Sequence, residues 1–328
     1  MAQQQGSNTK LLYQSEPIFK QVPVNADAMV LPFTSESLKK SRNLISSKTI
    51  RSGRNPQMPV RGNVEVGGDI SFEMSHQYGK MLHLALGSYV AVSGESVGMA
   101  AGTAKHTFKI GTLPSFTVEK QFPDLDTAKY FQYSGCRVNS LKVDIKSEGF
   151  IECSASLMGA RETIANSSFD AAPVDLGHTP FDGFEVALTD GGAVLANCTE
   201  ISFTVENNLD GSNYVIDGTG ERLAIPTGVA KVTGSVTALF ENSTLYEKAV
   251  NNTESVITIV LTLGTGVGTA GNEKLTITIP EVIYQPDAPA ISGPEGIKIT
   301  LPFEAYYDNN ANATALMAEL LSTTLFYG

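Results

Sequence analysis

The stretch Gly62-Asn63-Val64-Glu65-Val66-Gly67-Gly68-Asp69-Ile70-Ser71-Phe72 carries the pattern that decides the fold. Its apolar side chains fall on even positions, and polar residues or glycine stand between them. Because successive side chains of a strand point to opposite faces, this alternation predicts a β-strand with one face on a core. The same period of two recurs in other segments: Leu141–Ile145, Ile201–Val205, Val232–Phe240 and Leu275–Ile279. We therefore expect a mainly β protein.

The stretch also has a partner later in the chain, because Gly62-x-Val64-x-Val66-x-Gly68 returns as Gly228-x-Ala230-x-Val232-x-Gly234. Four further short matches keep the same order: Phe33-Thr34-x-Glu36 with Phe203-Thr204-x-Glu206, Tyr78-x-Lys80 with Tyr246-x-Lys248, Thr112-Leu113-Pro114 with Thr278-Ile279-Pro280, and Glu148-Gly149 with Glu295-Gly296. A repeat of this length suits two whole domains of one fold better than a solenoid. Coincidental similarity between two β-rich halves remains the alternative.

Helical patterns are short and few. Ser75–Leu86 has apolar residues at helical spacing and ends before Gly87, and a shorter helix is expected around Leu245–Val250. Gly, Asn and Pro clusters punctuate the strands and place the domain boundary near Ser167–Gly192. We expect an N-terminal arm over 1–28, a first β-sandwich or half-barrel domain over 29–166, a linker over 167–195 and a second such domain over 196–328, each domain with one short helix.

Composition narrows the classes of function. The chain has 328 residues and a formal net charge of −11, so it is a poor candidate for gripping nucleic acid, which needs Lys and Arg contacts. Three cysteines without a C-x-x-C pair argue against a disulfide framework and fit folding in a reducing cytoplasm. The polar Met1–Lys10 carries no signal-peptide core, and no stretch predicts a membrane span.

One segment reverses the acidic balance. Thr34–Gly62 contains seven basic residues and a single acid, Glu36, and the second half has no such excess. A solvated basic loop is the simplest interpretation, and weak DNA contact is another. The sharper hypothesis is a docking loop that meets an acidic surface on another copy of this chain. The candidate inter-subunit or inter-ring contacts are Lys39, Lys40, Arg42, Lys48, Arg51, Arg54 and Arg61.

The sequence contains no pattern typical of catalysis. Gly266-x-Gly268-x-x-Gly271 matches a dinucleotide-binding motif, but a strand pattern follows where that motif needs a helix. The four histidines show no zinc-ligand spacing, and the pairs Asp124/Asp126 and Asp182/Glu185 are ordinary in an acidic chain. We expect no enzyme activity, no cofactor and no metal ion.

Several strand and turn segments resemble the major tail tube protein of long, non-contractile-tailed bacteriophages (siphophages). These segments lie across most of the chain: Gly67–Glu73, Leu113–Lys120, Tyr133–Leu141, Glu148–Phe150, Leu157–Thr163 and Gly296–Ala305. The resemblance implies a structural virion protein whose sheets join edge to edge around a channel, in rings that stack into a tube for genome delivery. It also implies tail-tube-type domains that form a β-barrel ring on oligomerisation, with no cofactor.

The repeat and the resemblance together predict the assembly. Rings in this family commonly hold six single-fold subunits, so three chains with two copies each would give a trimer with pseudo-sixfold symmetry; a hexamer is the alternative. The expected partners are further copies in homo-oligomeric and stacked rings, other tail proteins and double-stranded DNA in transient, non-specific passage. We expect synthesis and assembly in the host bacterial cytoplasm and a place in the virion tail. A tandem β-sandwich adhesin is the alternative function, and an enzyme on a β scaffold ranks below it.

Overall fold

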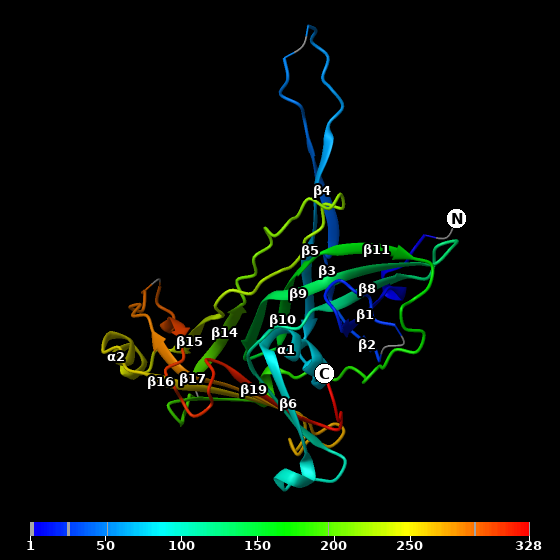
Figure 1. The fold of residues 1–328 in the computed structure, drawn as a ribbon. Helices are drawn as coiled ribbons and strands as arrows, with labels where there is room; N and C mark the ends of the chain where they lie inside the picture. The colour runs from blue at the N-terminus through cyan, green and yellow to red at the C-terminus, as the bar shows by residue number, and fades with distance from the viewer. Residues whose placement is uncertain (1–2, 25–26, 51, 196, 292, 328) are drawn as a thin grey trace.

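The computed structural model describes residues 3–24, 27–50, 52–195, 197–291 and 293–327. Within these ranges the chain forms a network of antiparallel strands with two short α-helices, as the alternating sequence pattern predicts. Two rows of strands make up most of the molecule, and a smaller third row shares a strand with the first. Figure 1 shows a hairpin made by β4 and β5 that projects far from this body.

The first row runs in the order β4, β5, β10, β9, β14, β15, β18, and it crosses from the first half of the chain to the second between β9 and β14. A two-residue strand, β3 (Ser35–Glu36), pairs with β5 beside β4. The bounds are β4 Lys39–Ile45, β5 Val60–Glu73, β10 Glu152–Gly159, β9 Lys129–Lys146, β14 Cys198–Glu206, β15 Lys231–Leu239 and β18 Lys298–Ala305.

The second row also joins the two halves, because the C-terminal strand β19 lies between β7 and β17. Its order is β6, β7, β19, β17, β16, β12, β13. The bounds are β6 Gly87–Ser93, β7 Ala104–Ile110, β19 Met317–Ser322, β17 Lys274–Tyr284, β16 Ser255–Thr262, β12 Val186–Asp190 and β13 Ala193–Val194. The strands β12 and β13 therefore lie in the segment 167–195, which the sequence predicted as a linker.

The third row is β2, β1, β8, β9, β11, with the N-terminal half of β9 as its shared strand. Its bounds are β1 Lys10–Ser15, β2 Met29–Val30, β8 Phe116–Phe122 and β11 Arg161–Ala165. The segment predicted as an N-terminal arm thus supplies β1, whose Leu11, Leu12 and Tyr13 are buried.

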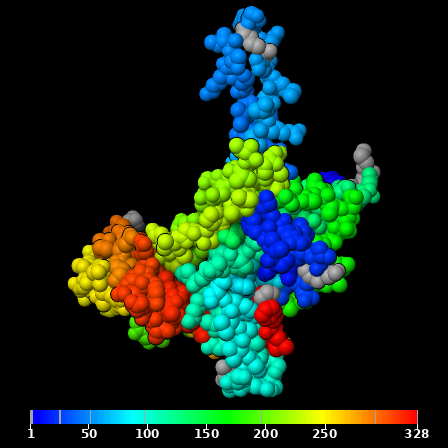
Figure 2. Space-filling view, in the orientation of Figure 1, coloured from blue at the N-terminus to red at the C-terminus, as the bar shows by residue number. Residues whose placement is uncertain are grey.

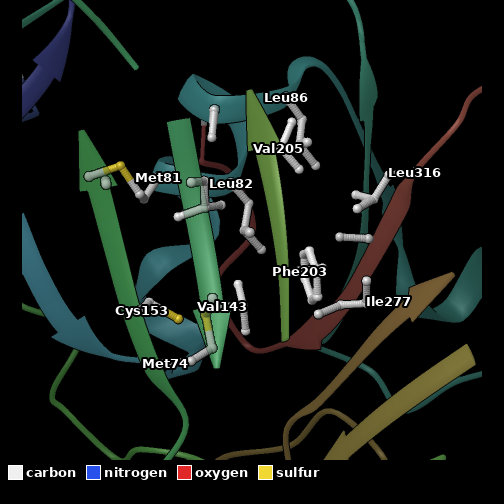
Figure 3. Close-up of a cluster of buried hydrophobic side chains, with 14 of the residues drawn as sticks. Met74, Met81, Leu82, Leu86, Val143, Cys153, Phe203, Val205, Ile277 and Leu316 are labelled. Carbon is white, nitrogen blue, oxygen red and sulfur yellow. The ribbon is translucent and has the colours of Figure 1, made fainter. Parts of the chain in front are cut away.

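The core lies between the first two rows and the helices. The helix α1 (Gly79–Leu86) follows a 3-10 turn at His76–Tyr78, and α2 (Thr244–Val250) stands at the corresponding place in the second half. Figure 3 shows Met81 and Leu82 of α1 in the same cluster as Val143 and Phe203 of the first row, with Ile277 of the second row beside Phe203. These side chains belong to one continuous buried cluster. Because that cluster spans both halves, each half covers part of the other.

The two halves pair their strands in the same register. Adding 166 to each β5 residue and 146 to each β10 residue turns all eight β5–β10 pairs into the eight β15–β18 pairs, so that Val66 opposite Gly159 becomes Val232 opposite Ala305. The strands β3 and β4 together correspond to β14. Adding 165 to their residues and 166 to those of β5 turns the pairs of β3 and β4 with β5 into pairs of β14 with β15, except near the β4 bulge. The first half and the second half are therefore built on one strand plan.

This register corrects part of the sequence repeat. The counterpart of Phe203 is Leu38, not Phe33, so the match at Phe33-Thr34-x-Glu36 is coincidental. Thr112–Pro114 lies between two strands, whereas Thr278–Pro280 lies inside β17. The glycines Gly68 and Gly234, by contrast, are true counterparts. Short matches of common residues can align segments that the hydrogen-bond register keeps apart.

Candidate assembly surfaces

The projecting hairpin carries most of the basic residues that the sequence singled out. Its two strands are β4 and the start of β5, and residues 46–59 form its tip, which Figure 2 shows standing clear of the body. We call residues 39–61 the arm. Lys39, Lys40 and Arg42 lie on β4, Arg61 lies on β5, and Lys48 and Arg54 lie at the tip; Arg51 falls outside the described residues. The structure thus brings the six described residues of the predicted set together on one element.

Few contacts inside the chain neutralise the arm. Lys40 Nζ lies 3.8 Å from Glu162 Oε1, and an Arg42 guanidinium nitrogen donates to the Thr219 carbonyl at 2.5 Å. Among the described residues, no carboxylate lies within 4 Å of the other basic arm residues that are described. Apolar side chains are also exposed there, with Ile50 at 97% and Met58 at 88%. A long exposed hairpin that combines positive charge with apolar side chains has the composition of a contact surface.

The first row of strands presents a polar face opposite the core. On β9 and β14 the polar face carries two alternating series, Ser140, Lys142, Asp144 and Lys146, and Glu200, Ser202, Thr204 and Glu206. Facing residues of neighbouring strands lie on the same side of a sheet, so these series line up across the strands. Short hydroxyl side chains therefore form bands between the charged ones.

Acids outnumber bases on this polar face. The acids are Glu65, Asp69, Glu73, Asp144, Glu152, Glu200, Glu206 and Glu304, and the bases are Lys39, Arg61, Arg137, Lys142, Lys146, Lys231 and Lys298. Three of the lysines lie near acids of the same face, with nitrogen–oxygen distances of 2.7 Å for Lys142–Asp144, 3.6 Å for Lys231–Glu304 and 3.8 Å for Lys146–Glu152. These three positive charges are thus compensated locally, and acids remain in slight excess on the face as a whole.

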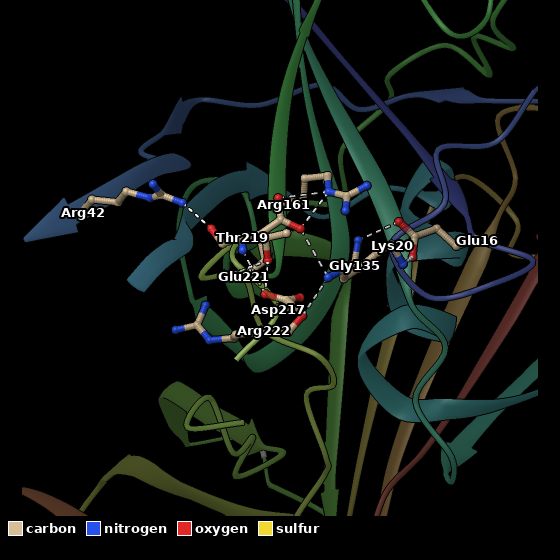
Figure 4. A network of polar contacts seen from close by, with 9 residues as sticks. All are labelled: Glu16, Lys20, Arg42, Gly135, Arg161, Asp217, Thr219, Glu221 and Arg222. Carbon is tan, nitrogen blue, oxygen red and sulfur yellow. Dashed lines mark hydrogen bonds and ion pairs between the residues drawn. The ribbon is translucent and has the colours of Figure 1, made fainter. Parts of the chain in front are cut away.

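A second polar cluster ties the two halves together at the base of the arm (Figure 4). The connection 207–230 between β14 and β15 runs back over the first half, where Arg222 donates to the Gly159 carbonyl at 2.7 Å. Glu221 accepts from Arg161 at 2.9 Å and lies 3.3 Å from Lys20 Nζ. The backbone N–H of Val64 donates to the Gly220 carbonyl at 2.7 Å. The sequence predicted only a turn at its start, Asn207–Gly211, because the rest of the connection has no periodic pattern.

The partly buried carboxylate of Glu16 lies beside this cluster. It accepts hydrogen bonds from Gly135 N–H and from the Thr117 hydroxyl, both at 2.7 Å, and from Lys20 N–H at 3.0 Å. Burial raises the pKa of Glu16 despite these donors. The three bonds are all structural, because they fix the turn after β1 against β8 and β9.

The carboxylate pairs that the sequence offered as weak catalytic candidates also have structural roles. Asp124 accepts from the side chains of Gln4 and Asn8, and Asp182 accepts from the first N–H groups of the 3-10 turn Gly183–Glu185. Over the described part of the chain, no group of three or more His, Cys, Asp or Glu side chains could hold a metal ion. These acids therefore secure loops.

The edges of the first row are the remaining surface of interest. At one edge, the outward backbone groups of Leu38 are bonded by side chains: Leu38 N–H donates to Glu36 at 3.0 Å, and Lys120 Nζ donates to the Leu38 carbonyl at 2.9 Å. Lys120 and Glu36 also form an ion pair at 2.7 Å. At the other edge, β18 pairs with β17 only at Phe303–Ala305. An edge that is open in the way β18 is toward its start can accept a strand from another chain.

Comparison with known proteins gives one match that covers most of the chain. A family model described as phage tail tube protein matches residues 6–305. No curated protein matches the chain. None of the helices formed by the described residues has the length and apolar character needed to cross a membrane.

Proposed function

The chain belongs to the phage tail tube protein family, so it is a structural component of the virion tail, and we propose that three copies close each ring of the tube. The shared register of the two halves carries this proposal, because it supports two copies of one tube domain in a single chain. We propose that these copies span 29–166 and 196–328, with 1–28 and 167–195 as flanking segments. Six domains per ring then require three chains, and a ring of six chains is the alternative.

We propose that the polar face of the first row lines the channel. Duplex DNA carries about one negative charge per 1.7 Å of its axis. A wall with excess carboxylates and many hydroxyls repels that charge weakly and offers few lysines to hold it. The acid excess and the local pairing of Lys142, Lys146 and Lys231 support free passage of the genome without sequence recognition.

We propose that the arm bridges neighbouring subunits or rings. It extends beyond the body, it is basic in an acidic chain, and its apolar side chains are exposed. Assembly would let the arm meet the acidic surface of another copy, where charge complementarity speeds and orients docking. The chain would be made in the host cytoplasm and assembled there with other tail proteins.

Electron microscopy of the purified, concentrated chain tests this function. The expected result is stacked rings or tubes with an open channel. A protein that stays monomeric at high concentration, with its fold intact by circular dichroism, contradicts self-assembly and favours a tandem β-sandwich binding module. Adding DNA to the tubes tests the channel role separately from self-assembly. The acidic face should form no stable complex with DNA at physiological salt.

A further inference from the structure

The edge formed by β18 is incomplete in the single chain. On one side β18 pairs with β15 over its whole length, Lys298–Ala305. On the other side it meets β17 at Val282–Tyr284, and one further hydrogen bond, from Gln285 N–H to the Pro302 carbonyl at 2.8 Å, continues that register. Residues 286–291 then leave the sheet as an exposed or partly exposed segment without strand structure.

The first half shows what fills the same edge. There β10, the counterpart of β18, pairs with β9, and β9 in turn pairs with β14. Ser140 of β9 lies opposite Ser156, whose counterpart is Pro302, so Gln285 occupies the place of Ser140. The segment that follows Gln285 therefore corresponds to the part of β9 that joins one half to the other.

The sequence of this segment has the side-chain alternation of a strand at this position, and Pro286, which has no N–H, could take part in the ladder only through its carbonyl. Gln285-Pro286-Asp287-Ala288 repeats the polar–apolar order of Ser140-Leu141-Lys142-Val143. In β9 the apolar residues face the core and the polar ones face the opposite side. If Gln285–Ala288 continues the register with β18, Pro286 and Ala288 fall on the core side and Gln285 and Asp287 on the channel side.

We propose that Gln285–Ala288 becomes a strand when the ring closes, held between β18 of its own chain and β4 of a second copy. This inference rests on the proposed function. The register comes from the junction inside the chain, where Thr204 of β14 lies opposite Lys142 of β9. The counterpart of Thr204 is Lys39, and the counterpart of Lys142 is Asp287.

The chemistry of the paired residues supports this register. Lys39 and Asp287 have opposite charges and would face each other on the channel side, where Ser41 would lie opposite Gln285. Opposite charges on directly facing residues stabilise a strand pair. Both edges are exposed in the single chain, so no contact within the subunit has to break for them to meet.

Strand direction also favours an interposed strand. β14 and β18 both run antiparallel to β15, so they point the same way, and β4 holds the place of β14. Direct contact of β18 with β4 of a neighbour would be a parallel pairing inside an antiparallel sheet. The interposed segment makes both contacts antiparallel. The ladder would end at Leu38, because the side chains of Glu36 and Lys120 already bind its outward N–H and carbonyl groups.

Cysteine cross-linking in assembled rings tests the junction. In a Cys198→Ser background, Lys39→Cys is combined with Asp287→Cys, and the remaining cysteines, Cys136 and Cys153, are buried. Facing residues of paired strands have Cα atoms about 4.5–5.5 Å apart, which a disulfide can span. Mild oxidation should convert the monomer band on a non-reducing gel into dimers and trimers.

The matched control combines Lys39→Cys with Thr300→Cys on β18. Under this proposal Thr300 lies one strand further away, about 10 Å from Lys39, which is too far for a disulfide. Links from Thr300 but not from Asp287 would show direct contact of β18 with β4 and overturn the proposal. Rings without links from Asp287 would overturn it while leaving the tube function standing. If the unmodified chain forms no rings at all, the proposed function fails and this junction fails with it.

Discussion

The imidazole of His106 is fully buried between β7 and the C-terminal residues. Its Nε2 lies 2.8 Å from the Thr324 carbonyl and its Nδ1 lies 3.0 Å from the Tyr89 hydroxyl. A neutral ring satisfies both, with Nε2–H as donor and Nδ1 as acceptor. Burial lowers the pKa of His106 to about 4. The ring is therefore neutral in the folded chain at neutral pH, and its Nε2–H ties the C-terminal segment to β7.

This burial predicts a loss of stability in acid. The unfolded chain binds the proton near pH 6.5 and the folded chain only near pH 4, so the free energy of unfolding falls as the pH drops through that window. The contribution is at most about 3 kcal/mol. Urea unfolding at pH 7.5 and pH 4.5 measures it, and His106→Gln should show a smaller difference between the two. An unchanged difference would show that another group is responsible.

Gly234 shows why one residue of the repeat has to be glycine. A Cβ there would lie 2.3 Å from the Ser202 carbonyl oxygen and 2.4 Å from the Phe303 ring. Its counterpart Gly68 is equally crowded, with Leu38 Cα 2.6 Å from such a Cβ. The strand plan thus brings a neighbouring backbone close at the same position in both halves.

Gly234→Ala should therefore destabilise the fold by about 1–3 kcal/mol, the usual cost of overfilling a packed site. Urea denaturation measures the change as a lower midpoint. Gly296→Ala is the matched control, because Gly296 also belongs to the sequence repeat but has no atom within 4 Å of its would-be Cβ. Equal midpoints for the two variants would contradict the crowding argument.

At the scale of elements, the docking role proposed for the arm can be tested separately from folding. It makes few contacts with its own subunit, so Lys48→Glu with Arg54→Glu should leave the free energy of unfolding nearly unchanged. The reversed charges would repel an acidic partner surface and shorten the tubes or stop their growth. Tube length by electron microscopy, with circular dichroism on the same samples, provides the measurement.

The control for the arm is Lys10→Glu with Lys129→Glu, which changes the net charge equally but lies on β1 and β9. Tubes of normal length from the control and short tubes from the arm variant are expected. Normal tubes from both would remove the arm from assembly. Short tubes from both would assign the effect to net charge instead.

The elements also show what the sequence could predict. Alternation such as Val64–Phe72 identified four strands of the first row, β5, β9, β14 and β15, and the helical spacing of Ser75–Leu86 identified the first helix. The third row was missed because its strand β8 pairs with β1 across more than a hundred residues, and local periodicity does not encode a distant register. For the polar face, the alternation showed only that every second side chain points away from the core, and it did not show what those side chains meet.

For the arm residues, too, the sequence predicted the local feature but not its place in the fold. Charge counting found the basic cluster because Thr34–Gly62 is a continuous segment. It could not show that Lys39 lies at a sheet edge while Lys48 lies at a projecting tip, since that depends on where β4 leaves β5. The two lysines consequently have different proposed partners, a neighbouring strand for Lys39 and a more distant surface for Lys48.

At the scale of the whole molecule, the two halves share a strand plan but differ at one connection. The β4–β5 connection, residues 46–59, forms the tip of the arm, whereas its counterpart, residues 207–230, folds back onto the first half. Duplication would therefore give a ring whose wall is nearly sixfold and whose projections follow the number of chains. The number of projecting arms therefore distinguishes a ring of three chains from a ring of six.

Averaged end-on images of single rings should accordingly show a wall with six similar segments and three projecting arms. The arms would alternate with three positions where the 207–230 connection lies flat against the wall. Imposing sixfold symmetry on such images should blur the arms while preserving the wall, and threefold averaging should sharpen them. Six arms around the ring, or a ring mass corresponding to six chains, would refute the trimer, because each chain carries a single arm.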